Sequence, residues 1–100
     1  MEKSRPAYDL VEIKRKLGSV EALRITRTAH REARSLGLRD VDIVDLIQSL
    51  RIQHFYKSMT TYADHRVWQD VYHVEFLERV YYVKFMADDV GYLIVSLKEK

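Results

Sequence analysis

The chain has 100 residues, enough for a modest hydrophobic core, and we expect a single domain over 1–100. The absence of cysteine excludes disulfides and thiolate metal sites and is compatible with a cytoplasmic location. Seventeen basic and 15 acidic residues give a net charge of +2, too small to indicate a nucleic-acid partner by itself. No apolar segment is long enough to span a bilayer and the N-terminus lacks a signal-peptide pattern, so we expect no membrane contact.

The first half of the chain carries apolar residues at helical spacing. This spacing predicts helices over about 8–17, 26–36 and 40–50, and Asp40 is expected to cap the third of them. Between the first two helices, residues 20–25 are short enough to form an edge strand.

Beyond residue 54 the period of the apolar residues changes from 3.6 to 2, which indicates strands. Strands are expected near 54–62, 67–73, 79–87 and 92–98, and the last two are joined by a hairpin at 88–91. Helices first and strands afterwards predict an α+β fold: a mostly antiparallel sheet with three helices packed on one face.

Alternation along the strands separates core from opposite-face side chains. Trp68 is the expected core anchor, which directs Gln69 to the other face, and Lys57 has the same parity as Phe55 and Met59. In the last two strands, alternation assigns to the core Tyr81, Val83, Phe85, Leu93, Val95 and Leu97. Four polar residues, one on each strand, are then candidates for a shared face: Lys57, Gln69, Tyr82 and Lys98.

These residue types suit RNA cleavage without a metal ion. The reaction needs an activated 2′-hydroxyl, a protonated 5′-oxygen and stabilisation of a negative pentacoordinate phosphate. Lysines supply positive charge, a tyrosine hydroxyl donates a proton, and a glutamine positions the phosphate. Each residue also has a structural interpretation, because edge lysines deter sheet-to-sheet pairing and tyrosines pack. A non-catalytic module that binds RNA or protein is therefore the alternative to an enzyme.

Two further patterns admit two interpretations each. His65 and His73 are candidates for two-histidine acid–base cleavage, although scattered histidines are more often surface or partly buried residues. No histidine spacing indicates a metal site, and we expect neither a metal nor a cofactor. A stripe of four arginines is either a phosphate-binding face or, more often for a stripe of this size, a solvated helix face: Arg24, Arg27, Arg31 and Arg34.

Two segments of the chain resemble the signature of the MqsR family, which comprises mRNA-cleaving toxins of type II toxin–antitoxin systems. They are Phe55-Tyr-Lys-Ser-Met-Thr-Thr-Tyr-Ala-Asp-His65 and Trp68-Gln-Asp-Val-Tyr72. The C-terminal residues 93–100 and the opening Met1-Glu-Lys3 with Pro6 are also similar. The resemblance covers the whole chain and is weakest in the helices. It implies the fold of RelE toxins.

The family resemblance also implies an activity: ribosome-independent cleavage of mRNA at short GC-containing triplets, such as GCU, which arrests translation and growth. The catalytic residues that it implies are Lys57, Gln69, Tyr82 and Lys98. The RNA-binding residues that it implies are Tyr56, Met59 and His73. At the last of these the best-known member of the family has arginine, so a permanent charge is replaced by a titratable one. The implied protein partner is an MqsA-type antitoxin with a zinc site and a DNA-binding helix-turn-helix, which places zinc in the partner.

Overall fold

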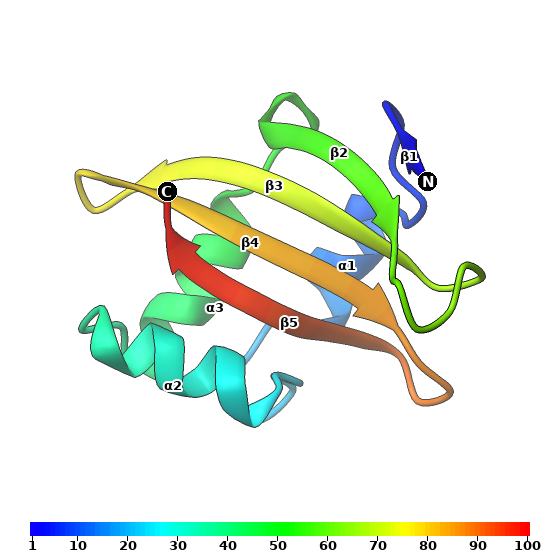
Figure 1. Cartoon of the computed structure of the whole chain (residues 1–100). Coiled ribbons are helices and arrows are strands. Elements are labelled where there is room, and N and C mark those ends of the chain that lie inside the picture. Colours follow the sequence, from blue (N-terminus) through cyan, green and yellow to red (C-terminus); the bar gives the residue numbers. More distant parts are fainter.

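A computed structural model describes all 100 residues as an antiparallel sheet with helices on one side (Figure 1). The five strands are ordered β1-β2-β3-β4-β5, and every neighbouring pair is antiparallel. This confirms the predicted α+β class. In chain order the elements are β1 (Glu2–Lys3), α1 (Leu10–Lys16), α2 (Arg27–Ser35), α3 (Asp40–Ser49), the 3-10 turn η1 (Ile52–His54), β2 (Phe55–Thr60), β3 (Trp68–Phe76), β4 (Arg79–Ala87) and β5 (Tyr92–Glu99).

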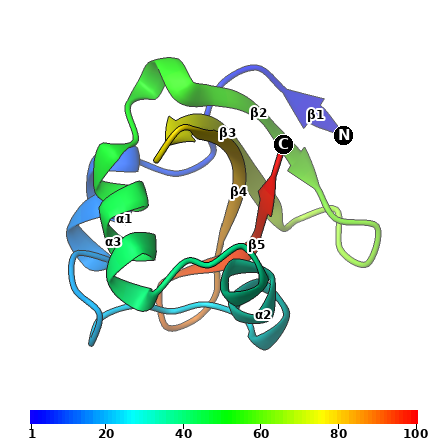
Figure 2. The same cartoon turned by 90° about the vertical axis from the view of Figure 1, so that its left-hand side faces the viewer.

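The helices leave one face of the sheet uncovered. Helices α1 and α3 lie behind the sheet in Figure 1, and α2 runs along the β5 edge (Figure 2). Seen from the side in Figure 2, α1 and α3 are on the left of the sheet, α2 lies below it beside β5, and the uncovered face is on the right. We call this uncovered surface the open face. None of the helices has the length and apolar character needed to cross a membrane.

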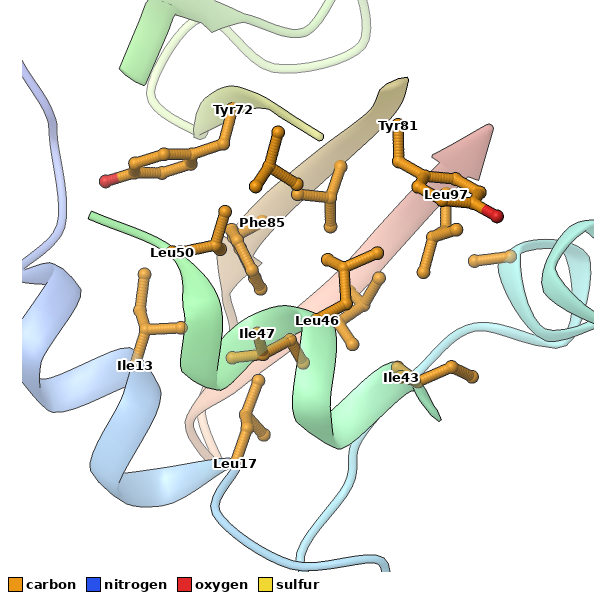
Figure 3. Close-up of a cluster of buried hydrophobic side chains, with 14 of the residues drawn as sticks. Ile13, Leu17, Ile43, Leu46, Ile47, Leu50, Tyr72, Tyr81, Phe85 and Leu97 are labelled. Carbon is orange, nitrogen blue, oxygen red and sulfur yellow. The ribbon is translucent and has the colours of Figure 1, made fainter. Parts of the chain in front are cut away.

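All three helices bury apolar side chains against the covered face of the sheet. The close-up in Figure 3 shows side chains of α1 and α3 pointing toward those of β3, β4 and β5. The helices contribute to this core Leu10, Ile13, Ala29, Ala33, Ile43, Leu46 and Ile47. The strands contribute Tyr72, Val74, Tyr81, Val83, Phe85, Ile94 and Leu97.

The predicted edge strand over 20–25 is wrong. Hydrogen bonds from Ala22 N–H to the Ser19 carbonyl and from Leu23 N–H to the Val20 carbonyl turn this segment back on itself. Only Ile25 pairs with the sheet, through a single parallel bridge to Ile94 in β5. The opposite edge is formed by β1, which is too short to show an apolar period.

The first turn of α3 also differs from the prediction that Asp40 caps it. Asp40 is the first residue of the helix, and its carboxylate binds His30 and Arg34, which joins α2 to α3. The carboxylate that closes the first turn belongs to Asp42, which accepts a hydrogen bond from the Arg39 backbone N–H at 2.8 Å. Both positions favour an acidic residue, because backbone N–H groups without helical partners point toward them.

Trp68 does not anchor the core, although its parity is that of the core residue Tyr72. It is half-buried near the end of β3, and Lys3 Nζ lies 4.2 Å from the centroid of its ring. The fully buried aromatic residue of β3 is Tyr72, which makes edge-to-face contacts with Phe55 and Phe85.

Two β-bulges change the parity that alternation predicts. In β2 the register shifts between Phe55, which packs against the core, and Lys57. The prediction that these two side chains share a face is therefore wrong. In β5 the shift leaves Val95 unpaired between Ile94 and Ser96. Ile94 is therefore fully buried, whereas Leu93 and Val95, predicted as core, are only half-buried.

Candidate active site on the open face of the sheet

The register of the sheet arranges the open face in rows that cross the strands. An aromatic row consists of Tyr56, His73, Tyr82 and Lys98, and a lysine row consists of Lys57, Val71, Lys84 and Ser96. Met59 and Gln69 pair with each other in a third row. Neighbouring rows are two residues, or about 7 Å, apart along the strands, except at the bulge in β2, where Tyr56 and Lys57 are adjacent. All seven candidate site residues therefore lie on one face, as alternation along the strands indicated for the four polar ones.

The three rings of the aromatic row lie next to one another, and one pair of them is stacked. The imidazole of His73 lies 4.4 Å from the Tyr56 ring, centroid to centroid, with only 20° between the planes. On its other side the Tyr82 ring is 5.6 Å away and tilted by 38°. The tyrosine on the open face is therefore Tyr82, because its neighbour Tyr81 is buried in the core. Aromatic platforms of this kind bind unpaired bases by stacking.

Two of the predicted lysines are held by carboxylates at opposite edges of the face. Lys57 Nζ lies 3.3 Å from a Glu2 carboxylate oxygen in β1, and Lys98 Nζ lies 3.5 Å from Glu32 in α2. Their strands are three spacings apart, which separates the two backbones by roughly 14 Å. Exposed ion pairs contribute only about 0–1 kcal/mol, so an incoming phosphate can replace either carboxylate.

Lys84 occupies the middle of the face and was not among the site residues predicted from the sequence. It pairs with Val71 in β3 and with Ser96 in β5, and its Nζ lies 5.6 Å from the Tyr82 ring centroid. No carboxylate oxygen lies within 4.0 Å of it, in contrast to Lys57 and Lys98. Its position two residues after Tyr82 in the same strand could have identified it, because side chains two residues apart in a strand lie on the same face.

Gln69 lies near the start of β3, away from His73, and Met59 lies opposite it in β2. Gln69 and His73 are four positions apart, which is about 13 Å along the strand. Met59 borders a surface hollow that is also lined by Glu2 and His65. His65 is therefore far from His73, and the two histidines do not form the shared acid–base site considered above.

Asp70, in the same signature segment as Gln69, points to the covered side of the sheet. Its carboxylate is fully buried and accepts hydrogen bonds from the Ser58 hydroxyl at 2.6 Å and from the backbone N–H groups of Ala7 and Tyr8 at 3.0 and 2.9 Å. These bonds fasten the N-terminal segment to β2 and β3. Adjacent residues of one motif thus face opposite sides, one available to a ligand and one holding the fold.

The surroundings of His73 favour its neutral form. Burial is the main cause that lowers the pKa of this imidazole, and the positive charge of Lys100 acts in the same direction. Neither ring nitrogen hydrogen-bonds to another protein group. The other histidines near helices differ, because His30 binds the Asp40 carboxylate and His54 accepts a hydrogen bond from the Arg51 N–H.

The arginine stripe does not act as one surface. Arg24 makes two hydrogen bonds to the Asp88 carboxylate, at 2.8 and 2.7 Å, and Arg34 binds the Leu38 carbonyl and Asp40. These two side chains hold loops and helices together, which agrees with the structural interpretation. Only the remaining pair, Arg27 and Arg31, lacks an ion pair. No group of three or more histidine, aspartate or glutamate side chains is arranged to hold a metal ion.

An open sheet face that combines aromatic rings with lysines, on a small α+β chain, has the features that proteins use to bind single-stranded nucleic acid. Comparison with known proteins makes this assignment more specific. Residues 5–99 match the family model described as "Motility quorum-sensing regulator, toxin of MqsA". The "mRNA interferase toxin MqsR" of Escherichia coli (strain K12) is 44% identical over 101 residues, which cover 100% of both chains. The chain therefore belongs to the MqsR toxin family, which confirms the resemblance.

Proposed function

We propose that this protein is a toxin that acts as an endoribonuclease on mRNA, with the reaction taking place on the open face of the sheet. The observation that carries the proposal is the aromatic row beside three lysines, of which Lys84 has no carboxylate partner. Stacked rings hold unpaired bases, and ammonium groups stabilise the charge of a phosphate under attack. The name of the relative from Escherichia coli supports the same activity.

The roles follow from the rows. Lys57, Lys84 and Lys98 stabilise the pentacoordinate phosphate, and Tyr82 donates a proton to the leaving 5′-oxygen. Gln69 and Met59 position the RNA at one end of the face, and its bases stack near Tyr56 and His73 at the other end. The 2′-oxygen attacks the adjacent phosphorus, the bond to the 5′-oxygen breaks, and a 2′,3′-cyclic phosphate remains. The face is rich in ammonium groups, which suit a phosphate, whereas Mg²⁺ is usually held by carboxylate oxygens, so we propose cleavage without a metal ion.

The family resemblance supports the finer parts of the proposal. They are cleavage independent of the ribosome, at short GC-containing triplets such as GCU, and control by an antitoxin of the MqsA type that carries zinc and a helix-turn-helix. The family description names MqsA as the partner of the toxin. Zinc then belongs to the antitoxin.

Mapping the 5′ ends of a defined mRNA after incubation with purified protein and EDTA tests the activity. We expect cuts beside one recurring triplet. Lys57→Ala and Lys84→Ala should each lower the cleavage rate by roughly 100-fold, the effect of removing one group that stabilises the transition state. Lys16→Ala is the matched control, because this exposed lysine at the end of α1 lies outside the rows. Intact RNA with a gel shift would instead establish the non-catalytic binding module.

A further inference from the structure

The proposed reaction lacks a proton acceptor among the residues assigned so far. At neutral pH lysine and tyrosine side chains ordinarily carry their protons, and the glutamine amide does not titrate. The 2′-hydroxyl must nevertheless lose its proton before or during its attack on phosphorus. A base is therefore needed on the open face. Within the rows defined above, the one side chain that titrates near neutrality is His73.

We propose that His73 is the general base that removes the proton of the attacking 2′-hydroxyl, an inference that rests on the proposed endoribonuclease function. The geometry that supports it is the position of the imidazole in the aromatic row. Tyr56 and Tyr82 fix the ring from both sides, with centroids 4.4 and 5.6 Å away. Both ring nitrogens are free of protein hydrogen bonds, unlike those of His30 and His54 that bind Asp40 and the Arg51 N–H. A ring held by stacking keeps its nitrogens available to a substrate.

The order of the row places base and acid side by side. His73 pairs across the strands with Tyr82, and Tyr82 pairs with Lys98. In the reaction, His73 takes the 2′-proton as the 2′-oxygen–phosphorus bond forms. Tyr82 gives its hydroxyl proton to the 5′-oxygen as the phosphorus–5′-oxygen bond breaks, while Lys98 lies beside it as a cation. The products are a 2′,3′-cyclic phosphate and a 5′-hydroxyl. His73 then releases its proton to water, and Tyr82 regains one from water.

The protonation state required of a base agrees with the surroundings. Burial and Lys100 lower the pKa of His73, so the neutral imidazole prevails at neutral pH. Four of the seven ionisable groups around it on this face are cations, which oppose an added positive charge on the imidazole. From β2 to β5 and the residue that follows β5, these groups are Tyr56, Lys57, Glu75, Tyr82, Lys84, Lys98 and Lys100.

Three substitutions separate proton transfer from stacking and from charge. His73→Phe keeps an aromatic ring between the two tyrosines but accepts no proton. His73→Arg keeps a cation, and His73→Gln keeps neither ring nor titration. Single-turnover cleavage of an RNA oligonucleotide that contains the mapped triplet is measured from pH 5 to 9. Binding is measured separately with the same oligonucleotide carrying a 2′-deoxy sugar at the cut site, which cannot react.

For the wild-type protein we expect the rate to increase with pH as His73 loses its proton, with the midpoint below the ordinary histidine value of about 6.5. Each variant should cleave roughly 10²- to 10⁴-fold more slowly, the usual contribution of a general base. Each should also lose the acid limb of the profile. His73→Phe should bind the 2′-deoxy oligonucleotide within about threefold of wild type, because the stack remains.

Two results would overturn the assignment of His73 alone. One is a His73→Phe or His73→Arg protein that cleaves at the wild-type rate with the acid limb retained. The other is a wild-type cleavage rate that does not fall as the pH decreases below neutrality. This second result does not depend on whether any variant folds. Failure of the wild-type protein to cut any RNA would refute the endoribonuclease function, and the inference about His73 with it.

Discussion

Gln69 and Asp70 offer a crossed test of activity against stability. They are neighbours in β3, but the Gln69 side chain lies on the open face without a hydrogen-bond partner in the protein, whereas the Asp70 carboxylate is fully buried with three donors. Hydrogen bonds to a charged group contribute about 1.5–3 kcal/mol each. Asp70→Ala should therefore lower the free energy of unfolding by about 4 kcal/mol, a large part of the roughly 5–15 kcal/mol typical of a domain.

Asp70→Asn is the variant suited to measurement. It keeps the shape and one carbonyl oxygen, so we expect a loss of about 2 kcal/mol. Gln69→Ala should change the unfolding free energy by less than about 0.5 kcal/mol, as is usual for such a substitution, while lowering the cleavage rate roughly 100-fold. Urea unfolding followed by circular dichroism, together with cleavage assays under native conditions, measures both quantities.

Ser58→Ala provides the control within the same network. Alone it should cost about 1.5 kcal/mol, and in the Asp70→Asn protein it should cost clearly less, because the two side chains share one hydrogen bond. An Asp70→Asn protein that keeps the wild-type urea midpoint and yet loses cleavage would contradict this prediction. Asp70 would then act in the reaction and not in the fold.

Three other predictions concern stability and use the same urea assay. Tyr72→Phe should raise the free energy of unfolding by about 1 kcal/mol, because the Tyr72 hydroxyl is buried without a partner; a loss would refute this. Glu78 turns between β3 and β4 at φ 67°, so Glu78→Gly should stabilise and Glu78→Val destabilise, each by about 1 kcal/mol. Hydrogen bonds from Arg39 hold the pKa of Asp42 at about 2, below its ordinary 3.8. The stabilisation by the ionised Asp42 is present above about pH 4 and is lost as the pH falls through 2. Asp42→Asn should therefore reduce the dependence of the unfolding free energy on pH in this range. An unchanged dependence would contradict the prediction.

Most elements of the fold follow from the period of the apolar residues. The strand over 79–87 was predicted with its observed bounds, and the one near 92–98 is shorter than observed by one residue. Long segments with a regular period carry enough signal for this. β1 has two residues, too few for any period to appear, and its pairing with β2 depends on a segment more than 50 residues away. Tertiary contact, and not local preference, decides such a strand.

The site residues were predictable from the sequence where side chains alternate regularly along a strand and where the residue belongs to the family signature. On the inner strand β4, parity placed Tyr82 on the open face, and the same parity held for Lys84. Lys84 was missed because an interior-strand lysine on an uncovered face looks like an ordinary surface charge. Only the structure shows that it lies between two lysines that have carboxylate partners while it has none.

The two outer strands of the site escaped simple alternation because each contains a bulge. In β2 a regular strand would put Phe55 and Lys57 on one face, so either the ring would leave the core or the ammonium would enter it. The bulge at Tyr56 removes this conflict and sets Tyr56 against His73. The bulge at Val95 does the same in β5: Ile94 and Leu97, three residues apart, both reach the core, and Lys98 still reaches the open face.

Bulges of this kind re-aim side chains and occur often beside active sites. The flanking sequence conceals them, since the apolar run 93–95 satisfies either parity. The regular inner strands β3 and β4 carry His73, Tyr82 and Lys84, whereas both bulged strands deliver a lysine to the edge of the same face. The rigid centre of the sheet thus holds the groups that must transfer protons at defined positions. The irregular strands supply charge, which acts over a longer range and tolerates less exact placement.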